Sequence, residues 1–432
     1  MDSIWRINDR MPHFPKLQED IKTDVVIIGG GMAGLLCAYQ LKKAGTDCIL
    51  VEADRICSGV TGNTTAKITV QHGLIYDKLI REYGVEIAQG YYLAQNEALS
   101  VYKDICTNIQ CDFEEKSSVV YSCNNRQILE TETAALERIG CNADFLEDLE
   151  LPMVTAGGVR IGGQAQFQPL KFATTIAEKL RILEHTRALE IRGDCVITDK
   201  GSMKADKVIV ATHFPFINKH GMYFMKLYQH RSYVLALKNA QGVDAMYVDA
   251  DKKGLSFRNY GDVLLLGGGS HRTGKSGGSW QELEHFCNMY YPKAEVITKW
   301  ATQDCVTLDG MPYIGMYSNN TPNLYVATGF NKWGMTSAMV ASIILADLVQ
   351  GGKNDFTHIF DPARSITHPQ LVLNAFESVK GLLIPTVPRC PHLGCALKYN
   401  KQEHSWDCPC HGSRFAENGK LLDNPATGDK EF

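Results

Sequence analysis

The sequence predicts a mixed α/β fold with an interleaved antiparallel sheet and a small β lobe at the C-terminus. A β-branched run over 24–28 leads through glycines into a helical stretch, and further short apolar runs alternate with helices. Four of the fourteen cysteines crowd into residues 390–410, where turn-forming residues are frequent. The 432 residues exceed what one simple hydrophobic core supports, so two or three domains are expected.

The first fifty residues indicate a β–α–β unit. Residues 24–28 have the composition of a buried strand, residues 33–44 form a helix that Gly45 ends, and residues 48–51 form a second strand. Amphipathic helices fill much of 75–140. Later elements are strands at 186–191, 195–198, 207–211, 263–266 and 324–327, a helix at 337–348, and one more helix near Gln370–Lys380.

The charge and the hydrophobic pattern of the sequence indicate which partners and which cellular location to expect. The net charge of −4 and the pI of about 6.4 give no reason to expect nucleic acid or an anionic membrane as a partner. The first twenty residues lack the apolar region of a secretory signal, and no run of about 18 apolar residues predicts a membrane span. We therefore expect a cytoplasmic protein, in which the ten scattered cysteines are buried small hydrophobes.

The glycines after the first strand match the G-x-G-x-x-G pattern of dinucleotide-binding units. Gly29 permits a tight turn, Gly31 lets the backbone approach a pyrophosphate, and Gly34 lets helix and strand pack closely. Glu52 ends the second strand, where a carboxylate can accept both ribose hydroxyls and disfavours a 2′-phosphate. Strand, helix, second strand and acid thus predict a site for FAD or NAD rather than NADP.

Over about residues 20–350 the sequence resembles the D-amino-acid oxidase / glycine oxidase superfamily of flavoproteins. The segments that carry the resemblance are DVVIIGGGMAGLLCAYQLKKAG at 24–45 with Glu52, SGVTGNTTAKIT at 58–69, ADKVIVATH at 205–213, LDGMPYIG at 308–315 and NLYVATGFNKWGMTSAMVASIILADLVQGG at 323–352. The resemblance implies FAD as the cofactor. Some relatives attach it through a cysteine seven residues before Asp309, where this chain has Thr302, so non-covalent FAD is expected.

The resemblance also implies which residues contact FAD. Beyond the glycine loop and Glu52, these are Thr61, Thr64, Thr65 and Ala66 along the pyrophosphate and ring, Ala188 on the adenine side, Thr212, and Gly329, Gly334, Met335 and Thr336 near the pyrimidine end. A helix N-terminus at that end would stabilise the anionic reduced flavin.

The expected domains follow from these segments. FAD-binding segments cover about 20–75, 156–213 and 301–350, and an interleaved substrate domain covers about 76–155 and 214–300. A connector over 351–380 leads to a C-terminal lobe at 381–432.

The C-terminal lobe contains a second cofactor motif. Residues 390–413 read CPHLGCALKYNKQEHSWDCPCHGS, in which Cys390-x-His392 and Cys408-x-x-His411 are fifteen residues apart. Two cysteines and two histidines could hold zinc. In a Rieske [2Fe–2S] centre, two cysteines hold one iron and two histidines the other, so each half-motif must supply one of each, as both do here.

The same segment resembles Rieske proteins, including the extra pair Cys395 and Cys410, which by that resemblance form a disulfide. Carried over to this chain, Cys390 and Cys408 bind one iron, and His392 and His411 bind the other. Ser413 keeps a hydroxyl that in high-potential relatives bonds a sulfide, whereas Phe415 replaces the expected tyrosine. The lost hydrogen bond should lower the potential within the range of about −150 to +300 mV.

The lobe is short for a complete Rieske domain. About 50 residues could hardly fold alone, so we expect a truncated lobe that packs on the flavoprotein body, stabilised by the disulfide and the cluster.

A flavin accepts a hydride, whereas a Rieske cluster accepts one electron at a time. The pair predicts oxidation of a small amine or amino acid at a C–N bond, with single-electron transfer through the cluster to or from a redox partner. The alternatives are an oxygen-consuming oxidase with a structural or regulatory cluster, and a non-enzymatic electron carrier. The sequence offers only weak candidates for catalysis, which are Arg231, Tyr233, Arg258, His271 and Lys332.

Overall fold

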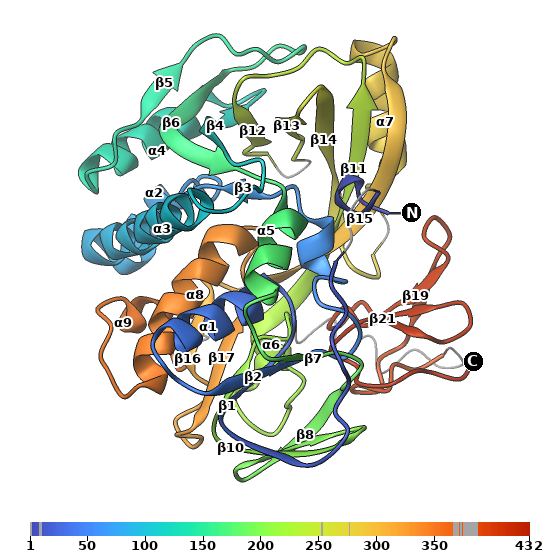
Figure 1. Cartoon of the computed structure of the whole chain (residues 1–432). Coiled ribbons are helices and arrows are strands. Elements are labelled where there is room, and N and C mark those ends of the chain that lie inside the picture. The colour runs from blue at the N-terminus through green and yellow to red at the C-terminus, as the bar shows by residue number, and fades with distance from the viewer. Residues whose placement is uncertain are drawn as a thin grey trace.

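The computed structural model describes residues 2–7, 11–251, 254–275, 277–365, 371, 374 and 388–432. Three sheets organise these residues, and Figure 1 shows them as two large layers with helices and one small C-terminal lobe. The helix that the sequence predicts near Gln370–Lys380 lies outside the described residues, apart from Leu371 and Asn374. Among the described helices, none combines the length and apolar character that crossing a membrane would require.

The first sheet is built on the β–α–β unit predicted from the sequence. Its strand order is β16-β17-β10-β1-β2-β7, and β8 and β9 extend it beside β10. The pairs β1–β10, β1–β2, β10–β17 and β2–β7 are parallel. The bounds are β1 Ile21–Ile28, β2 Cys48–Val51, β7 Ile182–Leu183, β8 Ala188–Arg192, β9 Cys195–Thr198, β10 Gly201–Val210, β16 Tyr313–Met316 and β17 Leu324–Thr328.

Helices α1 and α8 cover this sheet and pack on each other. Helix α1 (Met32–Lys43) buries Leu35, Leu36 and Leu41, and α8 (Gly334–Val349) is apolar around most of its circumference because other elements surround it. The main hydrophobic core lies between them and α3. The other helices are α2 Tyr76–Tyr83, α3 Val85–Cys106, α4 Arg126–Arg138, α5 Pro169–Ala177, α6 Tyr223–Lys226, α7 Trp280–Tyr290 and α9 Thr357–Phe360, with short 3₁₀ turns at Ile4–Arg6 and Val60–Asn63.

The second sheet has the order β15-β11-β14-β13-β12-β4-β6-β3, with β5 beside β6. Its bounds are β3 Lys67–Ile68, β4 Glu114–Ser122, β5 Asp144–Leu146, β6 Gly157–Gln166, β11 Leu227–Lys238, β12 Met246–Asp249, β13 Ser256–Tyr260, β14 Val263–Arg272 and β15 Glu295–Thr307. The sequence assigns residues 156–213 to the FAD-binding segments, but β6 belongs to this second sheet. The physical reason is that β6 pairs with β4 from Gln166 to Gly157, and strand pairing is non-local.

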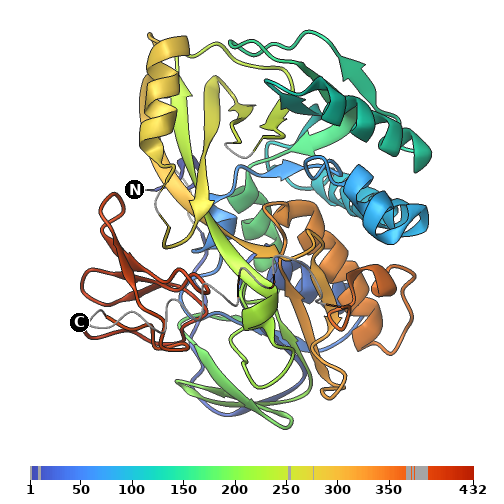
Figure 2. The ribbon, with the colours of Figure 1, turned by 180° about the vertical axis from the view of Figure 1, so that it is seen from behind.

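The C-terminal lobe is a four-stranded antiparallel sheet in the order β18-β19-β20-β21, with bounds Lys398–Asn400, Ser405–Asp407, Arg414–Ala416 and Leu421–Asp423. Its own core is small and includes four cysteines, Leu397, Phe415 and Ala426. Figures 1 and 2 both place this lobe, in red, against one flank of the molecule beside the long strands β11 and β15. The lobe therefore rests on the body, as the sequence led us to expect from its length.

Candidate functional site

The glycine loop between β1 and α1 leaves no room for side chains at two positions. A Cβ on Gly29 would lie 2.5 Å from the carbonyl oxygen of Ala211, and Gly29 has a φ of +112°. A Cβ on Gly34 would lie 1.9 Å from the carbonyl oxygen of Gly29. At Gly31 the nearest atom to a Cβ is the hydroxyl of Thr61, 3.4 Å away, so a side chain would make an ordinary contact there, and Gly31 lines the cavity. Gly29 and Gly34 thus allow two parts of the backbone to approach closely, whereas Gly31 leaves the backbone accessible to a ligand.

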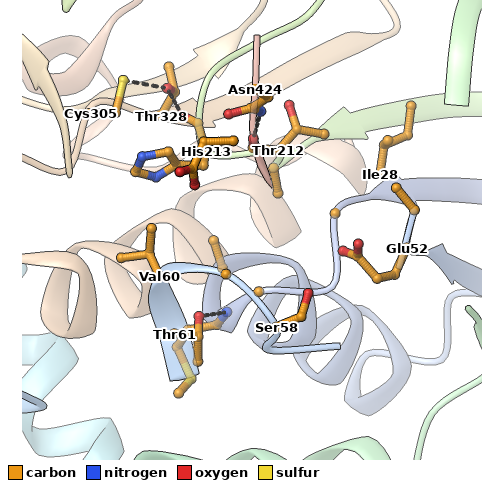
Figure 3. A pocket seen from close by; sticks show the side chains of 18 of the residues that line it. Ile28, Glu52, Ser58, Val60, Thr61, Thr212, His213, Cys305, Thr328 and Asn424 are labelled. Carbon is orange, nitrogen blue, oxygen red and sulfur yellow. Dashed lines mark hydrogen bonds between the residues drawn. The ribbon is translucent and has the colours of Figure 1, made fainter. Parts of the chain in front are cut away.

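This loop opens into a cavity of about 510 Å³. Most residues that the sequence assigns to FAD line it, namely Gly29, Gly31, Glu52, Thr61, Thr64, Ala188, Thr212, Gly329, Gly334 and Met335. Figure 3 shows Glu52, Ser58 and Thr61 on one side of the cavity and Thr212 and His213 on the other. Segments from five places in the sequence therefore meet around one elongated space, and the exposed N–H groups of the α1 N-terminus suit a pyrophosphate.

Four residues that the sequence assigns to FAD lie outside the cavity lining, namely Gly34, which packs against Gly29, and Thr65, Ala66 and Thr336. The carbonyls of Thr65 and Ala66 accept hydrogen bonds from the guanidinium of Arg258, at 3.0 Å for Ala66. Thr336 is buried and its hydroxyl donates to the carbonyl of Thr69 at 3.1 Å, facing away from the cavity. Arg258, a weak candidate for catalysis, is itself 1% exposed and lies over the ring of Trp5, so it supports the backbone at 65–66.

Glu52 lies in the cavity wall and also holds the glycine loop. Its carboxylate accepts the N–H groups of Gly30 at 2.7 Å and Asp54 at 2.9 Å. Burial raises the pKa of Glu52, and these backbone N–H groups oppose that shift. The carboxylate is therefore fixed at the end of β2, where the sequence predicts contact with a ribose.

Lys332 is the candidate for catalysis that lies in the cavity wall. It follows β17 at a φ of +73°, and its ammonium donates to the hydroxyl of Ser270. Asp304 lines the same cavity, and burial raises its pKa to about 6 although nearby cations oppose the shift. Lys332 is exposed in this structure, but desolvation lowers its pKa, and the charge of Asp304 partly opposes that shift. Two ionisable side chains thus line the same cavity as Gly329 and Met335.

Arg231, Tyr233 and His271 lie in the interface with the C-terminal lobe instead of in the cavity wall. Arg231 donates from Nε to the carboxylate of Glu403 at 3.1 Å, and the hydroxyl of Tyr233 donates to the same carboxylate at 3.0 Å. The ring of His271 lies 3.0 Å from the Tyr233 hydroxyl. Burial alone would raise the pKa of Glu403, but the charges of Arg231 and Arg414 lower it to about 2. These side chains therefore join two parts of the molecule and are not available to clamp a substrate carboxylate.

The four predicted cluster ligands come together in the lobe. Cys390, Cys408 and His411 are almost fully buried, and the rings of His392 and His411 are 5.0 Å apart. The Nδ1 atoms of both histidines are buried and have no hydrogen-bond partner among the described residues. Two unpartnered imidazole nitrogens and two buried thiols in the same lobe are the types of donor that a Rieske [2Fe–2S] centre uses.

The second pair of cysteines lies next to these ligands. The sulfur atoms of Cys395, Cys408 and Cys410 are within 4.8 Å of one another. The disulfide that the resemblance assigns to Cys395 and Cys410 is not formed in this structure, in which Cys395 is a free thiol. The disulfide between Cys395 and Cys410 therefore stays a prediction.

Buried amides hold the cluster loop against the body. Gln229 donates to the carbonyl of His411 at 2.8 Å, and Gln303 donates to that of Gly412 at 2.8 Å. Asn218 is hydrogen-bonded to Nε2 of His392 at 3.0 Å. No sequence motif marks these amides, because each contact joins residues more than one hundred positions apart.

One short segment connects the cavity to the cluster ligands. Thr212 and His213 line the cavity, and the next residue, Phe214, places its ring centroid 6.4 Å from that of His392 and 6.3 Å from that of His411. Phe214 is fully buried. Consecutive residues of one segment therefore contact the cavity and the cluster ligands.

Comparisons with known proteins agree with this geometry. A family model for FAD dependent oxidoreductases matches residues 24–348, and a model for the Rieske [2Fe-2S] domain matches residues 361–431. The chain is 34% identical to YhfW of Bacillus subtilis (strain 168), described as a Rieske 2Fe-2S iron-sulfur protein, over 98% of this chain and 96% of that one.

Two further similarities concern the flavoprotein body. The chain is 24% identical to gamma-glutamylputrescine oxidoreductase of Escherichia coli (strain K12), over 79% of this chain and 87% of the relative. The crystal structure of glycine oxidase from Geobacillus kaustophilus has the same fold, with a TM-score of 0.67 and 20% identity over 80% of this chain and all of that one. This chain therefore belongs to the FAD-dependent oxidoreductase family whose model spans 24–348, and it carries a Rieske [2Fe–2S] domain at its C-terminus.

Proposed function

We propose that the protein is a dehydrogenase that oxidises a small amine or amino acid at a C–N bond and exchanges the electrons singly with a partner protein through the Rieske centre. When bound, FAD would accept a hydride, and the [2Fe–2S] cluster would transfer one electron at a time. In the complete reaction, the substrate loses two electrons and two protons to form an imine, water hydrolyses the imine, and a one-electron acceptor is reduced twice.

The observation that carries this proposal is the segment 212–214, which contacts both the cavity and the cluster ligands. Thr212 and His213 face the flavin cavity while Phe214 faces both cluster histidines. Arg231 and the amides of Gln229 and Gln303 hold the lobe in this position. Single-electron exchange within one chain needs two redox sites that lie near each other, and this buried segment, which contacts both, supports that function over a purely structural cluster.

The substrate class rests on a similarity and on the cavity wall. The Escherichia coli relative acts, by its name, on gamma-glutamylputrescine, which is an amine. Lys332 and Asp304 are two ionisable side chains that line the same cavity as Gly329 and Met335. We propose that this pair positions the substrate, with Asp304 holding the proton that an incoming ammonium group must lose before it can give up hydride.

The test begins with anaerobic purification and a visible and low-temperature EPR spectrum of the reduced protein. Titration with amines and amino acids should bleach the flavin absorption with one class of substrate, and the EPR signal of the reduced cluster should rise in parallel. Bleaching that leaves the cluster oxidised would contradict electron transfer between the two sites.

The oxidase alternative predicts a different result. Turnover in air would release peroxide in stoichiometric amount, and this release would survive His392→Ala, which removes one cluster ligand. For the dehydrogenase that we propose, oxygen should be a poor acceptor, and turnover with a one-electron acceptor protein should be lost in His392→Ala.

A further inference from the structure

The flavin cavity has a wall that the FAD-binding segments do not supply. Residues 420–424, 426, 427 and 429 of the C-terminal lobe line the same cavity as Gly29, Glu52 and Thr61. Figure 3 shows Asn424 beside Thr212, across the cavity from Ser58 and Thr61. The strand β21 and the chain that follows it thus lie over the space that the glycine loop opens.

Asn424 anchors this wall to the flavoprotein body. Its side-chain amide donates to the carbonyl of Phe214 at 2.9 Å and also to the carbonyl of Thr212. Its own carbonyl accepts from the amide of Gln229 at 2.9 Å. The side chain of Asn424 therefore joins the lobe to the segment 212–214, and its backbone carbonyl joins the lobe to Gln229.

The same segment is tied to the cluster loop. The N–H of Ala426 donates to the hydroxyl of Ser413 at 3.0 Å, and Asp423 pairs with Arg414 at 3.0 Å. Ala426 is 2% exposed and packs in the small core of the lobe with Cys390, Cys408 and Cys410. It also lines the flavin cavity. A single residue thus has the cluster core on one side and the cavity on the other.

We infer that the C-terminal lobe is part of the FAD site: the segment 420–429 closes the cavity over the bound cofactor, so that FAD affinity depends on Asn424 and on an assembled cluster loop. The segment lines the space that the glycine loop opens, so FAD bound there would contact it. The segment is held by Ser413 and Arg414, which follow His411 closely in the chain. Loss of the cluster releases the loop that places these two residues, and the wall then opens more often.

The test on variants measures FAD release rather than turnover. In Asn424→Ala, which loses two hydrogen bonds to the body, the Kd for FAD should rise about tenfold. Serial dilution with flavin fluorescence gives the Kd, and EPR of the reduced sample confirms that the cluster is present. Gln402→Ala is the control, because Gln402 is an exposed amide of the same lobe that does not line the cavity. A Kd for Asn424→Ala within twofold of the control would overturn the proposal.

A second pair of measurements keeps the inference testable if Asn424→Ala loses its cluster. In the unaltered protein, hydrogen exchange at 420–429 should be slower with FAD bound than after FAD is removed, while exchange at 398–407 stays the same. Equal exchange at 420–429 in both states would overturn it. In Cys408→Ser, which removes a cluster ligand, the Kd for FAD should rise at least as much as in Asn424→Ala. An unchanged Kd would show that FAD affinity does not depend on the assembled cluster loop.

Discussion

The two cofactor regions of this molecule are built in opposite ways. The flavin cavity begins with backbone: Gly29 and Gly34 allow β1 and α1 to meet, and the N–H groups of the helix end face the ligand. The cluster lobe depends on side chains from another part of the chain, because Gln229, Gln303 and Arg231 hold its loops in place. The first region is stabilised by a large hydrophobic core. The second has only a small core and is stabilised in addition by its contacts with the body.

The size of the two cores explains the difference. The core around α1 and α8 draws on residues from most of the chain. Within residues 388–432, the core of the lobe has seven buried residues, four of them cysteines, and the strands are three residues long. So small a core leaves little free energy for independent folding. We infer that contacts across the interface hold the lobe in position, which the following four experiments test.

The largest effect is expected from Arg231→Met. This change leaves the buried carboxylate of Glu403 with Arg414 as its remaining close cation, and breaking a buried pair costs about 3–5 kcal/mol. Urea unfolding followed by the visible absorption of the cluster should show loss of the lobe before the flavin body unfolds. Arg160→Met, at an exposed pair with Asp144, is the control. Equal unfolding midpoints for the two variants would mean that the interface does not stabilise the lobe.

The pH dependence of the same interface should be the next effect. The pKa of Glu403 is lowered from 4.5 to about 2, so its contribution to stability is complete above pH 4.5 and is lost as the pH falls toward 2. The free energies of unfolding of the wild type and of Glu403→Gln are compared from pH 6 to pH 3.5. Their difference should shrink by about 1.4 kcal/mol per pH unit below 4.5. A constant difference over that range would show that Glu403 titrates normally.

Gly34→Ala should act on the flavin region alone. The added Cβ would meet the carbonyl oxygen of Gly29 at 1.9 Å, so α1 must move away from β1. We expect about 1–3 kcal/mol of destabilisation and weaker FAD binding, with the EPR signal of the cluster unchanged. Gly162→Ala is the matched control, since a Cβ at that position would meet no atom within 4 Å beyond its chain neighbours. FAD affinity equal in both variants would contradict the role of the close approach.

The smallest effect on stability is expected from Asn218→Ala. It removes one hydrogen bond to Nε2 of His392, worth about 0.5–1.5 kcal/mol. Because groups that bond a metal ligand tune the centre, the g values and potential of the reduced cluster should change although its iron content does not. Asn319→Ala, at an exposed position of the body, should leave both unaltered. Unchanged g values in Asn218→Ala would show that this contact does not reach the cluster.

Local elements could be predicted from the sequence, and non-local ones could not. The predicted helix at 33–44 is Met32–Lys43, and the predicted strand at 48–51 is Cys48–Val51. The long strand β11 (Leu227–Lys238) is not among the predicted strands. Residues 233–237 are buried on both faces, because Val234 and Ala236 pack in one core of the body and Leu235 and Leu237 in another, so a period of two is not visible in the apolar residues.

The sequence by itself determined the two cofactors and predicted ten residues that line one cavity, because the glycine loop, the acid at 52 and the spacing of the cluster ligands are properties of short segments. Only the tertiary structure decided that Arg231 pairs with Glu403, 172 positions away, and that Asn424 closes the flavin cavity against Thr212, 212 positions away. Periodicity and spacing report the local conformation of a chain. They carry no information about which distant polar groups will meet when two domains bury their faces against each other.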